Sequence, residues 1–95
     1  MAFKEFDASG YLTDPEDVMA YLNAVLDGGN AQEVALAIGT IARSEGMSKI
    51  ARDAGLNRVS LYTSLSDEGN PSFDTVLRVL DVLGFRIRIE RKPPF

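Results

Sequence analysis

Apolar residues recur every three or four positions along most of this chain, and each repeat is bounded by residues that favour helix ends. The first repeat predicts a helix that begins at a Thr13 N-cap, has Pro15 and Glu16 in its first turn, and ends at Gly28. The side chains expected to face inward from this helix are Val18, Met19, Leu22, Val25 and Leu26.

Two further repeats predict helices on either side of the middle of the chain. One has a capping box of Asn30 and Glu33 and ends at Gly46, and its inward face is Val34, Ala37, Ile38, Ile41 and Ala42. The other follows the turn-like sequence DEGNP at 67–71, begins at a Ser72 N-cap and ends at Gly84. Its expected inward face is Phe73, Val76, Leu77, Leu80 and Leu83. The DEGNP stretch lacks the spaced oxygen ligands of a calcium loop, so a plain turn is expected.

Residues 47–64, MSKIARDAGLNRVSLYTS, predict a short helix, a tight turn and a second helix. Ser48 is the expected N-cap of the first helix, Gly55 the left-handed residue that ends it, and Asn57 the N-cap of the second. The expected inward face is Ile50, Ala51, Ala54, Leu56 and Leu61. Two helices that cross steeply over these residues form a helix-turn-helix, although a packing corner in a small helical domain has the same spacing.

In a helix-turn-helix, the second helix points side chains outward that can reach base edges in a DNA major groove. The candidates here are Arg58, Val59, Ser60, Tyr62 and Thr63. Tyr62 has an alternative interpretation as a half-buried core aromatic, because tyrosine often presents an apolar body to a core and a polar tip to water.

The spacing changes near the end of the chain, where apolar residues alternate with charged ones. Phe85, Ile87 and Ile89 are expected on one face of a short β-strand, since alternate residues of a strand share a face. A lone strand cannot satisfy its backbone, so this one is expected to pair with a second copy of the chain, or with the sheet edge of another protein. The predicted fold is therefore an all-α bundle of about five helices with a C-terminal β-strand that pairs in a homodimer.

Composition narrows the classes of function. The chain has 95 residues, with no cysteine and no histidine. One domain of this size has a thin core, and the usual general base, thiol nucleophile and zinc ligands are missing. An enzyme, a metal site and a cofactor are therefore not expected. No apolar run approaches the ~20 residues that span a bilayer, and the first residues lack a signal-peptide core, so we expect a cytoplasmic protein.

Charge is distributed unevenly around a net value of −4. Residues 1–30 contain one lysine and six acids, whereas residues 43–62 have four basic and two acidic residues, and residues 85–95 have four basic and one acidic. This asymmetry predicts two different partners, and the acidic head is expected to face a basic one. The acids Asp14, Glu16 and Asp17 also suit the first turn of a helix, which explains them better than a metal site does. We divide the chain into an acidic arm and helix (1–29), a DNA-binding domain (30–84) and a strand with its tail (85–95).

The succession of a helix, a capped helix with a buried alanine, a glycine turn, a recognition helix, an NPS turn and a closing helix to LG resembles the lambda-repressor-like (XRE-type) helix-turn-helix domain. More narrowly, FDASGYLTDPEDVMAYLNAVLDGGN and IARSEGMSKIARDAGLNRVSLYTSLSDEGNPSFDTVLRVLDVLG resemble the HigA-like addiction-module antidotes, and the likeness extends over residues 6–89. This resemblance implies an antitoxin of a type II toxin-antitoxin module. Such a protein binds a toxin of the RelE/ParE superfamily and represses the promoter that both share. A helix-turn-helix regulator with no toxin partner is the alternative.

Roles follow for individual residues under this resemblance. Contacts to DNA phosphates are expected from Arg43, Ser48, Lys49, Arg52 and Asn57. Arg52 could instead pair with Glu45 or another surface acid. Val59 stands where such domains commonly have a polar base-reading residue, and it could contact a thymine methyl group. Toxin contacts are expected from Phe3, Phe6, Tyr11, Leu12, Asp14, Glu16 and Asp17.

Overall fold

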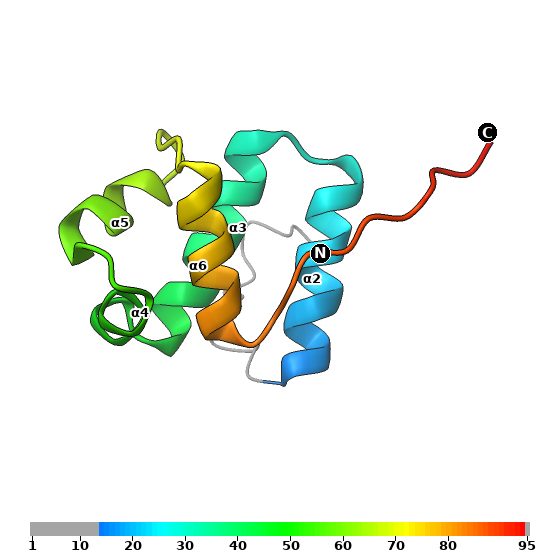
Figure 1. Ribbon diagram of the computed structural model, residues 1–95. Helices are drawn as coiled ribbons and strands as arrows, with labels where there is room; N and C mark the ends of the chain where they lie inside the picture. Colours follow the sequence, from blue (N-terminus) through cyan, green and yellow to red (C-terminus); the bar gives the residue numbers. More distant parts are fainter. Residues whose placement is uncertain (1–13, 95) are drawn as a thin grey trace, which may run out of the picture.

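The computed structural model describes residues 14–94, and five α-helices are its regular secondary structure in that range. They are α2 (Pro15–Gly28), α3 (Ala31–Glu45), α4 (Met47–Ala54), α5 (Arg58–Ser64) and α6 (Phe73–Leu83). Helix α3 packs against α2, α4 and α6, while α4 also contacts α5 and α6, so α3 and α4 connect the whole bundle (Figure 1). The all-helical prediction is confirmed for these residues. None of the described helices is long and apolar enough to cross a membrane.

Side chains next to the helices satisfy the first backbone N–H groups, as most of the predicted caps require. Asn30 and Glu33 form the expected capping box, because each side-chain oxygen accepts the other residue's backbone N–H at 2.9 Å. The Ser72 hydroxyl accepts the Thr75 backbone N–H at 3.0 Å. Gly84 ends α6 with a φ of 94°, a left-handed conformation that glycine adopts at little cost. These local predictions are confirmed.

Two predicted N-caps are wrong. Helix α2 is capped by Asp14, whose carboxylate accepts the Glu16 backbone N–H at 2.9 Å, and Thr13 lies outside the described residues. Helix α4 begins at Met47, directly after Gly46, so Ser48 is already inside the helix and makes no cap. Gly46 has a φ of 106° and is the only residue between α3 and α4. The N-cap position of α4 is therefore Gly46, which has no side chain, and Ser48 is the second residue of the helix.

The core lies where α3 and α4 meet the other helices. Its fully enclosed large side chains are Ile41, Ile50, Leu61, Leu65 and Val79. The inward face predicted for 30–46 is confirmed, with Val34 only partly buried. The predicted faces of α2 and α6 are partly wrong, because Met19, Leu26, Phe73 and Leu77 are exposed while Val79 is buried. Helix α6 contacts α3 and α4, and its apolar side chains Phe73 and Leu77 face solvent.

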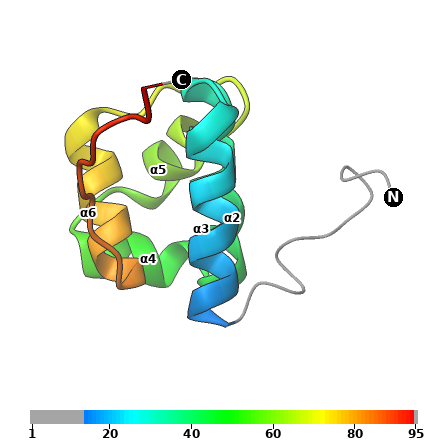
Figure 2. The same cartoon turned by 90° about the vertical axis from the view of Figure 1, so that its right-hand side faces the viewer.

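The chain after α6 has no regular secondary structure in residues 85–94. Phe85 is partly buried against the core, and its backbone N–H donates to the Leu80 carbonyl at 2.8 Å. Beyond Phe85 the chain leaves the end of α6, and its last part projects away from the helices (Figures 1 and 2). A strand would need a partner, so the predicted dimerisation through Phe85, Ile87 and Ile89 stays a prediction.

Candidate nucleic-acid interface

A glycine turn sets the angle between α4 and α5. Gly55 has a φ of 71° and a ψ of 35°, the left-handed conformation predicted for this position. The Leu56 backbone N–H then donates to the Ala51 carbonyl at 2.8 Å, which closes the end of α4. A side chain at this position would be strained whatever the space around it. The Asn57 side chain next accepts the Ser60 backbone N–H at 2.9 Å and so begins α5.

One side of the α4–turn–α5 unit is buried. The buried residues are Met47, Ile50, Ala51, Ala54 and Leu61, and Leu56 packs partly against the core. The predicted inward face is therefore confirmed. Because Leu61 is the buried residue of α5, the rest of this short helix turns outward.

All five predicted base-contact residues lie on the exposed side of α5, namely Arg58, Val59, Ser60, Tyr62 and Thr63. Val59 is 65% exposed and Tyr62 is 51% exposed. Tyr62 is not among the residues that form or pack against the core, so its alternative interpretation as a core aromatic is not supported. Arg58 makes no ion pair with any residue of the described chain. Its guanidinium is therefore available to an external acceptor.

Two helices contribute to this surface, because Arg43 of α3 reaches Tyr62 of α5. The Arg43 guanidinium lies 5.8 Å from the centre of the Tyr62 ring, which is within range of a cation–π contact. Nη2 of Arg43 also donates to the Thr40 hydroxyl at 3.4 Å. These contacts hold a cation beside the exposed face of α5.

The remaining predicted phosphate contacts lie on α4 and at the start of α5. Lys49 and Arg52 share the carboxylate of Asp53, at 3.4 Å and 3.6 Å. Arg52 therefore pairs with a surface acid, which is Asp53 and not Glu45, and its contact with a DNA phosphate stays a prediction. Both basic side chains are mostly exposed, so such an ion pair is weak and leaves one net positive charge among the three groups. Ser48 and Asn57 are exposed as well.

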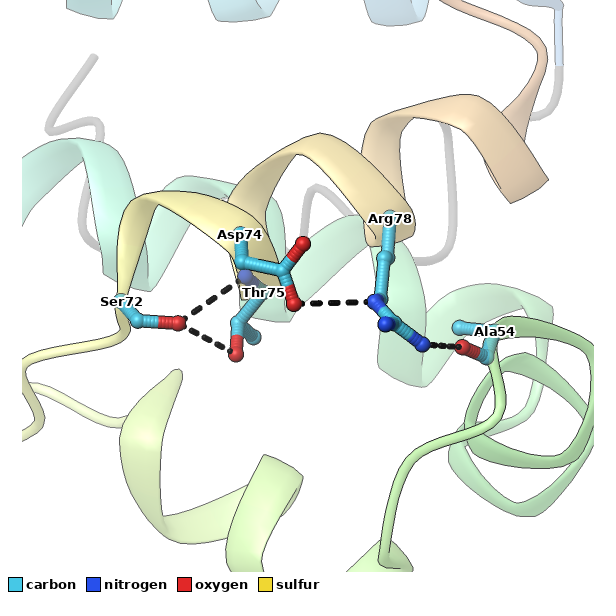
Figure 3. A network of polar contacts seen from close by, with 5 residues as sticks. All are labelled: Ala54, Ser72, Asp74, Thr75 and Arg78. Atoms are coloured by element: carbon cyan, nitrogen blue, oxygen red, sulfur yellow. Dashed lines mark hydrogen bonds and ion pairs between the residues drawn. The ribbon is translucent and has the colours of Figure 1, made fainter.

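Arg78 is a positioning residue of the α4–turn–α5 unit that sequence reasoning did not find. Its Nη1 donates to the carbonyl of Ala54, the last residue of α4, at 3.2 Å, and its Nε pairs with Asp74 Oδ2 at 2.9 Å (Figure 3). Carbonyls at a helix C-terminus lack intrahelical donors and attract positive charge. Arg78 therefore attaches α6 to the end of α4. The four-residue spacing from Asp74 is visible in the sequence, but the contact with Ala54 is tertiary.

The acidic surface lies at the start of α2, the first helix of the described chain. Asp14, Glu16 and Asp17 are all exposed, and none forms an ion pair within residues 14–94. Met19 and Leu26 are exposed on the same helix, at 48% and 61%. Within the described residues, no group of acidic residues is suited to hold a metal ion. The predicted toxin contacts Phe3, Phe6, Tyr11 and Leu12 lie outside these residues.

Comparison with known proteins identifies relatives of nearly the whole chain. The model of a family described as "Probable addiction module antidote protein" matches residues 2–91. An uncharacterized protein of Haemophilus influenzae (strain Rd) is 42% identical over 88 residues, which cover 93% of this chain and 91% of that protein. No solved structure matches the chain.

Proposed function

The chain belongs to the family of probable addiction module antidote proteins, and from this premise we propose that it is an antitoxin that also represses its own operon. In this proposal it binds a toxin of the RelE/ParE superfamily in the cytoplasm. As a homodimer, it also binds a palindromic operator through α4 and α5. The family match over residues 2–91 is the observation that carries the antitoxin role.

The outward face of α5 supports the DNA-binding part of the proposal. A helix that enters the major groove needs exposed donors, acceptors and apolar groups along one side. Arg58, Ser60 and Thr63 supply the polar groups, and Val59 supplies an apolar surface for a thymine methyl group. Arg43, Lys49 and Arg52 lie on the neighbouring helices as candidate phosphate contacts. The chain is acidic in total, so the positive charge near α4 and α5 has to act locally.

The exposed acids at the start of α2 support the toxin-binding part. A toxin that handles nucleic acid has a basic surface, and acidic groups on the antidote would steer association with it. The apolar side chains Met19 and Leu26 on the same helix provide surface that can be buried in a complex. We place the toxin on this helix and on the arm that precedes it.

Co-expression of this chain with the product of the adjacent gene tests the antitoxin role. We expect the two proteins to purify together and the chain to relieve the growth arrest that the gene product causes by itself. A gel shift with the shared promoter then tests repression. Binding to the promoter without any toxic or co-purifying neighbour would favour the alternative, a helix-turn-helix regulator that has no toxin partner.

A further inference from the structure

The chain after α6 presents an unpaired backbone. From Arg86 to Pro94, no backbone group hydrogen-bonds to another backbone group of residues 14–94. This segment is extended and leaves the helices as a single strand-like trace (Figure 1). Water satisfies such a backbone in a single chain, but alternating apolar residues beside it favour pairing with another strand.

The two faces of this segment differ. Phe85 is partly buried against the core, Ile87 is 46% exposed and Ile89 is 94% exposed. The apolar face therefore begins on the chain's own helices and extends beyond them. The opposite face carries Arg86, Arg88 and Glu90, since successive residues of an extended chain point to opposite sides.

We propose that two copies of the chain pair these segments as an antiparallel two-stranded ribbon whose two-fold axis passes through Arg88. In this register Arg86 lies opposite Glu90 of the second copy, and the same pair occurs again on the other side of the axis. On the apolar face, Ile87 lies opposite Ile89 of the second copy, and Phe85 stands opposite Arg91 at each end of the ribbon. Opposite charges and β-branched residues in directly opposed positions both stabilise a β-ribbon.

Other registers fit the sequence less well. An axis through Ile87 places Arg86 opposite Arg88 on both sides, which makes two like-charged pairs, whereas the axis through Arg88 leaves one, Arg88 opposite its own copy. An axis through Ile89 pairs Arg88 with Glu90, but it places Ile87 opposite Arg91 and Arg86 opposite Lys92, so it loses the pairing of Ile87 with Ile89 and adds two like-charged pairs. A shift by a single residue mixes isoleucines and arginines on both faces of the ribbon, because it reverses the side to which one strand points. A parallel pair in register would align each charged residue with its own copy.

The proposed register also explains the exposed Ile89. Ile87 is 46% exposed but lies only two residues after Phe85, which packs against the core, so a residue opposite Ile87 lies beside the same helices. Ile89 of each copy is thereby brought over the second copy's bundle, where it can be covered. This inference rests on the proposed function only in that it specifies the dimer which would bind a palindromic operator.

Disulfide formation by single-cysteine variants tests the register directly, because the chain has no cysteine of its own. Opposed residues of an antiparallel pair have Cα atoms about 4.5–5.5 Å apart, within the range of a disulfide. We expect Arg88→Cys to form a covalent dimer rapidly under mild oxidation. Arg86→Cys and Glu90→Cys should form it at least about tenfold more slowly, because each lies four residues, or roughly 14 Å, from its own copy. The double variant of 86 and 90 should cross-link.

A charge exchange provides a second readout on the full chain. Arg86→Glu and Glu90→Arg should each raise the dissociation constant of the dimer, by roughly tenfold, and the double exchange should restore it. Lys92→Glu makes the same change in net charge as Arg86→Glu outside the paired charges and serves as the control. Sedimentation equilibrium measures all four variants.

Neither experiment requires DNA or a toxin, so its failure is separate from failure of the proposed function. Faster cross-linking at Ile87→Cys or Ile89→Cys than at Arg88→Cys would overturn the register. A monomeric chain at all accessible concentrations would overturn the pairing itself. A tail that pairs only after the co-expressed neighbouring gene product is added would also overturn it, because the segment would then belong to a sheet edge of that protein.

Discussion

Gly39 lies in the middle of α3, where glycine normally weakens a helix. Glycine is needed here because Leu65 lies very close to the α3 backbone. A Cβ at position 39 would collide with the Leu65 backbone carbonyl and lie 3.0 Å from the Leu65 Cβ. Leu65 is fully buried directly after α5, so the absence of a side chain on α3 lets the end of α5 pack against it.

Gly39→Ala should therefore lower the free energy of unfolding by about 1–3 kcal/mol, the usual cost of forcing extra volume into a packed site. Gly28→Ala is the matched control, since a Cβ there meets no atom within 4 Å. The control should be neutral or stabilise the protein by up to about 1 kcal/mol, because alanine restricts the unfolded chain. Urea denaturation followed by circular dichroism measures both. Equal stability of the two variants would contradict the close approach.

Arg58 is exposed and makes no ion pair within the described chain, so its removal should affect DNA binding without affecting the fold. Arg58→Ala should weaken operator binding by about 1–3 kcal/mol and relax the base preference at one position. Lys92→Ala, which removes an equal charge from the tail, should have a smaller effect. A gel-shift titration against operator variants checks this, and unchanged affinity would remove Arg58 from the base contacts.

Tyr21 gives a pH dependence. Burial raises the pKa of its phenol above the ordinary value of 10.0, and a hydrogen bond with Thr40 partly opposes this shift. A raised pKa in the folded state contributes stability below pH 10 that is lost as the pH rises through the folded pKa. The stability difference between the native chain and Tyr21→Phe should therefore change between pH 8 and pH 11, to the native chain's disadvantage. Chemical denaturation at both values tests this, and a constant difference would count against it.

At the scale of elements, Arg78 controls how α6 meets the end of α4. Arg78→Met keeps most of the aliphatic stem but removes the donor to the Ala54 carbonyl. We expect a loss of about 1–2 kcal/mol in the free energy of unfolding, the low end for a hydrogen bond to a charged group, because the Arg78 side chain is half exposed. Asp74→Asn is the control, because it removes the exposed ion pair and the acid in the first turn of α6 but keeps the donor to Ala54, and it should cost less than about 1 kcal/mol. If the two variants unfolded alike in thermal melts, Arg78 would act merely as a surface charge.

Helix ends and helix faces were predictable to different degrees, and the difference is physical. Caps such as Asn57 and Ser72 accept a backbone N–H three residues further along the chain. Because the residues involved are close in sequence, the sequence alone predicts these helix starts correctly. The start of α4 was misplaced because a single residue, Gly46, connects it to α3. The face of α6 was misplaced at Phe73 and Val79, since periodicity gives the spacing of apolar residues but not which of two apolar stripes a neighbouring helix covers.

At the scale of the whole molecule, the α5 surface could be anticipated from the sequence because a single buried residue, Leu61, fixes which way that helix turns. The Arg43–Tyr62 contact and the Arg78 attachment could not, because each joins helices that are distant in sequence. The acidic surface was anticipated from charge alone. Its apolar extension at Met19 and Leu26 differs from the sequence prediction, because helical spacing alone places both side chains on the buried face.

The acidic surface on α2 lies apart from α4 and α5 (Figure 1), so we predict that toxin binding and operator binding can be weakened separately. Glu16→Lys combined with Asp17→Lys should weaken binding to the co-purified toxin roughly tenfold or more, because opposed charges across an interface speed association and like charges oppose it. Asp14 is left intact, since its carboxylate caps α2. Both substituted side chains are exposed, although lysines in a helix's first turn cost some stability.

Operator affinity should stay within about threefold of the native value, which corresponds to less than about 1 kcal/mol. Stopped-flow association with the toxin and a gel shift with the promoter measure the two activities on the same preparation. Loss of both would indicate that the two surfaces are not independent, and loss of operator binding alone would assign the acids to the wrong partner.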